Sequence, residues 1–243
     1  MKLRLSVLFA TLVACAAGPL RAADSVGLVL AKARAYLGSE SALNAVATIH
    51  FTGTLEVDAN TKLPVDIIFQ KPFQQRITVT SAKVIEVTAL DDYDAWQKRT
   101  NPANPIQWQV TLLDSGQVKR LRANTWENLN FFAGIEKKGG SVQFDGDATA
   151  DGIACAKLSF VHADNIIFVR YFEKTTGRLV RTETESGAEI REEGEMIVNG
   201  VRFPKKVINK APDGTATTIV FDQVTLNAAV AGTEFAVPTF RTN

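Results

Sequence analysis

Residue types that commonly carry out catalysis are few in this sequence, and they are scattered. The two histidines, His50 and His162, lie in segments that alternate like strands, and neither has a cysteine or carboxylate at a metal-ligand spacing. No GxSxG or SxxK motif marks a serine nucleophile in the mature chain. Cys155 lies in a segment with the pattern of a buried strand, where a thiolate is disfavoured. We therefore expect no catalytic residue, no metal ligand and no cofactor, and a hydrolase is the least favoured function.

Two groups of aspartates have the residue type that binds calcium. Residues 91–94 hold three aspartates at a predicted turn, and residues 145–151 hold three more with the alternating spacing of calcium-loop ligands. The second group lacks the glutamate that such a loop needs at its last position, and Asp-Gly pairs are common turn formers. No two carboxylates stand out as the pair of a glycosidase. We interpret both groups as turns.

The C-terminal part of the chain, from Asn165 onward, has the pattern of consecutive β-hairpins. Its apolar–polar runs are separated by turn sequences, of which Asn-Gly is the strongest because both residues tolerate the positive φ of a type I′ turn. Consecutive hairpins build an antiparallel meander, and a wide, curved meander has an inner face that side chains, a helix or a ligand must fill. The predicted turns are Thr175–Gly177, Ser186–Gly187, Asn199–Gly200 and Pro212–Gly214.

Strands and helices are both predicted in the preceding part of the chain. Alternation with a period of two indicates a half-buried strand at Ile49–Val57, and two prolines predict a loop at residues 101–105. Helical spacing predicts helices at Ser25–Leu37, Glu40–Val46 and Ser115–Gly134, the last capped by Asp114 or Ser115 and inserted between two runs of strands. Further strands are expected at Leu63–Phe69, Gln75–Thr80, Lys83–Thr88, Ala95–Arg99 and Ile106–Leu112.

The first residues have the composition of a secretory signal peptide. A basic start at Met1–Arg4 precedes the apolar run Leu5–Ala17, and a small residue, Ala22, follows at a suitable cleavage point. The predicted organisation is a signal peptide at residues 1–22 and one domain at residues 23–243. The alternative is a lipobox, Leu12–Cys15, in which Cys15 is lipidated and anchors the protein to a membrane.

The charge balance points away from nucleic acid. The 243 residues include 27 lysines and arginines and 26 aspartates and glutamates, which give a net charge of +1. If the signal peptide is removed, Cys155 is the only remaining cysteine, so the chain has no intramolecular disulfide. Its stability must then come from an apolar core.

Aromatic residues are more informative than polar ones. The chain has fourteen phenylalanines, three tryptophans and three tyrosines, and several fall where the inner face of a sheet is expected. They could simply fill a core, but a sheet of about ten strands encloses a space near the size at which barrels hold a ligand. The candidate lining of this cavity is Phe51, Phe69, Trp108, Trp126, Leu129, Phe132, Phe168, Phe203 and Phe221.

Several short motifs resemble those of LolA/LolB-like periplasmic proteins. The helix that ends at Gly38 and the strand Ile49–Leu55 resemble the start of that superfamily. Tyr171–Leu179 resembles its hairpin with a Thr-Gly turn, and Gly200–Pro204 and Thr233–Pro238 resemble its later strands and closing segment. The resemblance extends over nearly the whole mature chain and rests on the order and spacing of these motifs.

The resemblance implies a mainly β fold with helical insertions, an unclosed antiparallel barrel of about eleven strands with helices as a lid or plug. It also implies a monomeric periplasmic carrier that binds the acyl chains of lipoproteins or other lipids and meets envelope membrane proteins. Arg120 and Arg122, on the inserted helix, are the candidates for basic residues that hold the lid. The alternative is an envelope-anchored scaffold or assembly factor, tethered through Cys15, that has a solid core and no cargo cavity.

Overall fold

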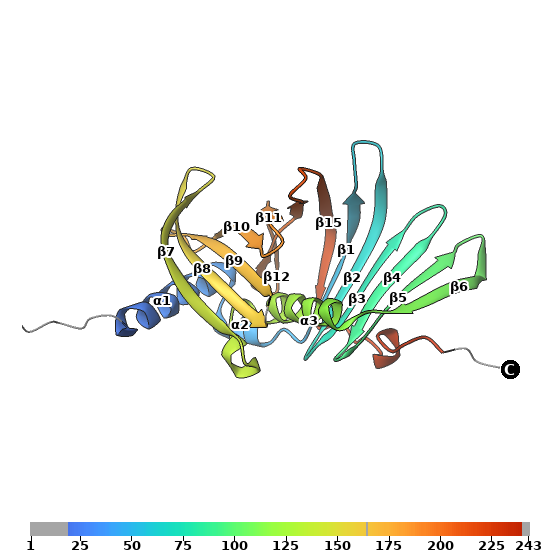
Figure 1. Ribbon diagram of the computed structural model, residues 1–243, viewed down its shortest axis with the longest axis horizontal. Helices are drawn as coiled ribbons and strands as arrows, with labels where there is room; N and C mark the ends of the chain where they lie inside the picture. The colour runs from blue at the N-terminus through green and yellow to red at the C-terminus, as the bar shows by residue number, and fades with distance from the viewer. Residues whose placement is uncertain (1–18, 164, 240–243) are drawn as a thin grey trace, which may run out of the picture.

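A long antiparallel sheet of thirteen strands dominates the protein (Figure 1). The computed structural model describes residues 19–163 and 165–239, so Cys15 and most of the predicted signal peptide lie outside the described residues. The fold is mainly β and its sheet is unclosed, which confirms the predicted fold class, although the sheet has thirteen strands rather than about eleven. Its strands are β1 (Thr48–Glu56), β2 (Lys62–Gln70), β3 (Gln74–Thr80), β4 (Ile85–Asp91), β5 (Asp94–Asn101), β6 (Asn104–Leu112), β7 (Ser141–Ala150), β8 (Ile153–Ala163), β9 (Ile166–Glu173), β10 (Leu179–Thr184), β11 (Glu189–Glu193), β14 (Lys206–Lys210) and β15 (Ala216–Leu226).

The order of the strands explains why a helix crosses the sheet. The order is β6-β5-β4-β3-β2-β1-β15-β14-β11-β10-β9-β8-β7, so β6 and β7 are its two edges although they are consecutive in the chain. The segment between them must pass from one edge to the other, and the helix α3 (Ser115–Asn130) makes most of this crossing. Its 16 residues span about 24 Å at 1.5 Å per residue. Figure 1 shows α3 across the middle of the molecule, between the two halves of the sheet.

β-bulges help to bend the sheet around this helix. The pairing register of β1 with β15 shifts between Thr52 and Gly53, and that of β7 with β8 shifts between Phe144 and Gly146. At Gly53 a Cβ atom would lie 2.2 Å from the carbonyl oxygen of Val220, so the two backbones can approach this closely only because position 53 has no side chain.

The N-terminal helix α1 (Pro19–Leu37) begins before the predicted start at Ser25. Gly38 follows it, and a Cβ at this position would lie 2.5 Å from the carbonyl oxygen of Gly200 in a later turn. The short helix α2 (Glu40–Asn44) comes next, with Ser39 as its N-cap. None of the described helices combines the length and the apolar composition needed to span a membrane.

One hairpin leaves the main sheet. The prediction of one continuous meander from Asn165 onward is wrong here, because β11 pairs directly with β14, and β12 (Met196–Val198) and β13 (Val201–Phe203) form a separate two-stranded sheet. The Asn199–Gly200 turn between them has φ values of 50° and 78°, which confirms the predicted positive φ at both residues. The hairpin packs on the core instead: Val201 and Phe203 are buried there, and Met196 and Val198 pack against the same cluster.

The helix α3 begins as predicted but ends early. Asp114 forms a capping box with Gln117 at its start. The helix ends at Asn130 rather than at the predicted Gly134, because Phe131 and Phe132 adopt left-handed conformations with φ of 50° and 68°. This double turn directs their rings into different clusters, so that Phe131 packs with Phe203 and Phe132 with Phe160 and Phe172. Two short 3₁₀ helices, Ile135–Lys138 and Gly232–Glu234, complete the fold.

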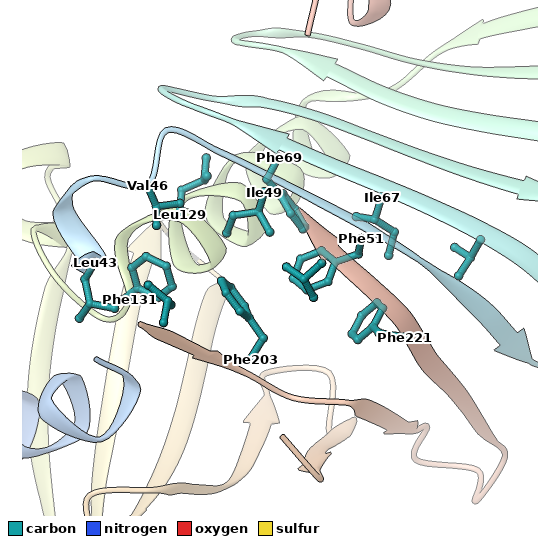
Figure 2. Packing of buried hydrophobic residues seen from close by; sticks show 13 residues of the cluster. Leu43, Val46, Ile49, Phe51, Ile67, Phe69, Leu129, Phe131, Phe203 and Phe221 are labelled. Carbon is teal, nitrogen blue, oxygen red and sulfur yellow. The ribbon is translucent and has the colours of Figure 1, made fainter. Parts of the chain in front are cut away.

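Two hydrophobic clusters lie between the sheet and α3. The first joins strands β1, β2, β13 and β15 to α2 and the end of α3, and Figure 2 shows its side chains converging from these elements. The second joins β8 and β9 to α1 and α3. The predicted loop at residues 101–105 is shorter than expected, since Asn104 and Pro105 already belong to β6. Pro105 is tolerated there because β6 is an edge strand.

Candidate ligand cavity

A cavity of about 300 Å³ lies between the concave face of the sheet, α3 and the β12–β13 hairpin. Strands from both halves of the sheet contribute to its wall, and Leu37 closes one side at the end of α1. Most of the wall is aliphatic or aromatic. Its apolar lining includes Ile49, Phe51, Ile67, Phe69, Ile77, Phe131, Phe132, Phe168, Leu179, Ile190, Phe203, Val207, Ile219 and Phe221.

Most of the residues expected to line a cavity from the sequence lie around this one. Six of them do so: Phe51, Phe69, Phe132, Phe168, Phe203 and Phe221. Leu129 lies behind the wall, with no exposed surface, and fills the core. Trp126 faces a different hollow, where its ring stacks 5.6 Å from Phe73. Trp108 lies on the edge strand β6, away from the cavity, with the Lys98 ammonium 4.7 Å from its ring centre.

Phe51 is at the centre of the aromatic wall. Its ring centre lies 4.5 Å from that of Phe221, 5.7 Å from that of Phe203 and 6.4 Å from that of Phe69. The rings of Phe203 and Phe69 meet it nearly edge-on, at 83° and 86°, which is a favourable aromatic arrangement. Figure 2 shows these rings side by side, from strands β1, β2, β13 and β15. The wall is therefore packed and preformed.

A buried triad is formed by Arg170 of β9, Glu127 of α3 and His162 of β8. Arg170 and Glu127 line the cavity, whereas His162 lines the hollow beside Trp126. Arg170 and His162 each contact one carboxylate oxygen of Glu127, and all three side chains are less than one-tenth exposed. Burial raises the pKa of the Glu127 carboxyl, but the Arg170 guanidinium and His162 together outweigh burial and hold that pKa below its ordinary value. Arg170 also lies over the rings of Phe160, Phe132 and Phe168.

Further contacts fasten α3 across the cavity. Thr125 donates a hydrogen bond of 3.0 Å to the side chain of Gln75 on β3. At the other end, the buried Arg34 of α1 donates hydrogen bonds to the carbonyl oxygens of Asn130 (2.9 Å) and Phe131 (2.7 Å). The Phe131 carbonyl would otherwise lack a donor among the described residues, whereas the Asn130 carbonyl also accepts from the backbone amide of Ala133 at 3.1 Å. A positive charge at a helix C-terminus is also favoured by the helix dipole.

The two arginines predicted as lid residues contact turns of the sheet. Arg120 forms an ion pair with Glu185, which follows β10. Arg122 forms an ion pair with Asp92, in the turn between β4 and β5, and its guanidinium lies 3.9 Å from the ring centre of Phe73 and 3.8 Å from that of Tyr93. The two residues therefore join α3 to opposite halves of the sheet.

A second hollow of about 430 Å³ adjoins the cavity, between α1 and the β11–β13 region. Leu179, Phe203 and Glu192 line both spaces, so they mark the passage between them. Glu192 is exposed, at the rim that the two spaces share, although other protein atoms lie close around its carboxyl group. The loss of bulk water raises the pKa of the Glu192 carboxyl, an effect that the nearby Arg170 guanidinium only partly offsets.

The other residues whose types could support catalysis or metal binding have structural roles. His50 contacts Asp66 at 2.6 Å. Cys155 has no exposed surface, and burial raises the pKa of its thiol, as expected for an unreactive cysteine. The aspartates at residues 145–151 point to three separate partners, Ser159, Lys174 and Arg191. No group of side chains able to hold a metal ion occurs among the described residues.

Comparison with known proteins supports the fold alone. No protein-family model matches the chain, and no curated protein is significantly similar to it in sequence. Among solved structures it is similar to a DUF1329 family protein from Desulfovibrio piger, at 11% identity and a TM-score of 0.56, over 87% of this chain and 97% of that one. It is also similar to a LolA superfamily protein from Nitrosomonas europaea, at 12% identity and a TM-score of 0.55, over 89% of this chain and 98% of that one. The resemblance seen in the sequence is thus confirmed at the level of the fold, which is LolA-like.

Proposed function

We propose that the mature protein, residues 23–243, is a periplasmic carrier that binds the acyl chains of lipoproteins or other lipids in the cavity beneath α3. The observation that carries the proposal is an apolar cavity with a preformed aromatic wall, enclosed between a curved sheet and a crossing helix. Such a space suits a ligand that needs burial rather than polar recognition. The shared fold with a LolA superfamily protein supports the same conclusion.

The physical basis of the affinity is the burial of methylene groups. Each methylene removed from water contributes about 0.8 kcal/mol, which is about fourfold in affinity. Binding in a cavity should therefore strengthen about fourfold per added methylene and then level off when the cavity is full. A chain that only adsorbs to the surface has no such limit of length.

The alternative of an envelope scaffold needs a solid core rather than a cavity, so the cavity favours the carrier. The tether through Cys15 is a separate matter from the cargo, because a carrier can also be anchored. Replacing Cys15 with serine and following the protein into soluble and membrane fractions tests the tether without touching the cavity.

The carrier is tested by filling the cavity. Val207 and Ile208 are adjacent half-buried aliphatic residues of β14, and only Val207 lines the cavity, because successive side chains of a strand face opposite ways. We expect Val207→Trp to reduce the uptake of a fluorescent fatty acid by at least about tenfold, equivalent to losing two buried methylenes, and the matched Ile208→Trp to leave it unchanged. Circular dichroism and thermal melting verify that both variants fold. Uptake that Val207→Trp does not reduce would contradict a cavity-bound chain.

A further inference from the structure

The cavity has one charged side chain without a partner, and it lies at the mouth. Glu192 lines both the cavity and the adjoining hollow. No described residue forms an ion pair or a hydrogen bond with its carboxylate. The neighbouring acids of the same region differ, since Glu193 pairs with Lys206 and Glu195 pairs with Arg202. Glu192 is therefore the one acid at this passage whose charge is left unbalanced among the described residues.

The positive charges that face Glu192 are already engaged. Arg170 is neutralised by Glu127, and its guanidinium is covered by phenylalanine rings, with only 8% of the side chain exposed. Arg202 pairs with Glu195, lies over the ring of Tyr36 and donates to the carbonyl oxygen of Tyr36. The third, Arg178, pairs with Glu173. The net charge available to a ligand at the mouth is thus negative.

Strand register places Glu192 where a head group would rest. Arg170 pairs with Thr182, and Thr182 pairs with Ile190, so the three form one row on the concave face. Glu192 follows Ile190 by two residues and faces the same way. A chain lying among the phenylalanines would bring its polar end past this row and out beside Glu192.

We infer that Glu192 selects amphiphiles whose head group carries an ammonium ion, with the alkyl or acyl chain in the cavity and the ammonium at the mouth. An ammonium ion supplies the hydrogen-bond donors and the positive charge that the Glu192 carboxylate lacks. A carboxylate head group would instead meet a like charge. Desolvation raises the pKa of the Glu192 carboxyl and the Arg170 guanidinium offsets this only in part, which agrees with a carboxylate that is incompletely compensated in the free protein. This inference rests on the proposed function.

The test compares three ligands with the same alkyl chain, dodecylamine, dodecanol and dodecanoate, by displacement of a neutral apolar fluorophore below their micelle concentrations at pH 7. We expect dodecylamine to bind about tenfold more tightly than dodecanol, and dodecanoate more weakly than both. In Glu192→Gln the ratio of amine to alcohol affinity should fall to about one. Glu189→Gln is the matched control, because Glu189 lies on the same strand, faces the other way and pairs with Arg191.

The outcomes separate the inference from the function on which it rests. If dodecanol and dodecanoate bind as tightly as dodecylamine, or if Glu192→Gln keeps the preference for the amine, the inference is overturned while the acyl carrier stands. If neither the fluorophore nor any of the three ligands binds, both fail. The ligand series in the unmodified protein decides the matter even if the Glu192→Gln variant does not fold.

Discussion

Removing one partner of the Arg170–Glu127 pair should cost much stability, because it leaves an uncompensated charge in the interior. Their side chains are 8% and 6% exposed, so Arg170→Met leaves the buried Glu127 carboxylate with His162 as its only remaining partner in the triad. Two unit charges about 4 Å apart at an effective dielectric constant of about 20 attract by about 4 kcal/mol. Removing one partner of a buried pair costs about 3–5 kcal/mol, and the remaining bond to His162 points to the lower end, about 3 kcal/mol.

Urea unfolding followed by circular dichroism measures this loss. The matched control is Arg191→Met, which breaks an ion pair with Asp151 that is about one-third exposed and should cost at most about 1 kcal/mol. The double variant Arg170→Met/Glu127→Leu should recover most of the loss, because an apolar pair no longer holds a buried charge. If Arg170→Met costs no more than Arg191→Met, the triad is not buried as described and the reasoning is refuted.

Three further predictions follow from the same contacts. The folded-state pKa of Glu127 lies below its ordinary value of 4.5, so its contribution to stability is present above pH 4.5 and is lost as the pH falls through the folded pKa. The free energy of unfolding should therefore fall less steeply with acidification in Glu127→Gln than in the unmodified protein. Equal slopes in the two proteins would argue against the pKa shift. Arg34→Met should cost about 1–3 kcal/mol and speed amide exchange in α3, since the Phe131 carbonyl loses its donor and the Asn130 carbonyl keeps only the backbone amide of Ala133; unchanged exchange would show that the helix does not depend on α1. The pKa of Glu192 is raised, so its ionisation disfavours the folded state as the pH rises above the ordinary carboxyl pKa. Without ligand at pH 7, Glu192→Gln should therefore have a higher melting temperature than the unmodified protein, and a lower one would contradict this.

Much of the architecture could be predicted from the sequence because its signals are local. Period-two alternation and turn residues located the strands, and the capping box at Asp114 located the start of α3. The separate β12–β13 hairpin could not be predicted, because an Asn-Gly turn specifies a hairpin without specifying which sheet it joins. The early end of α3 also escaped prediction, since it depends on two phenylalanines in a conformation that bulky residues seldom adopt.

The candidate site was predicted only on its apolar side. Phenylalanines on the inner faces of strands were recognisable, but Trp108 was misplaced because the sequence does not give the order of strands across a sheet, and β6 is an edge. The charged triad does have a signal in the sequence. Arg170 interrupts an inward row of Ile166, Phe168 and Phe172, and a charge at such a position needs a buried partner.

Glu192 had no comparable signal in the sequence. Its position at the mouth depends on how the β12–β13 hairpin and the distant end of α1 fold around the cavity, and local sequence patterns do not reveal this arrangement. Its lack of a partner also depends on ion pairs formed by neighbouring residues, which adjacent sequence cannot reveal.

Native mass spectrometry of the protein isolated from its own cells without detergent tests the central claim most directly. We predict a population heavier than the polypeptide, whose extra mass is released by organic solvent and contains an acyl or alkyl chain. The same preparation of Val207→Trp, with its cavity filled, should carry less of this material. A bare polypeptide mass in the unmodified protein, together with no uptake of added dodecylamine, dodecanol or dodecanoate, would contradict the acyl carrier.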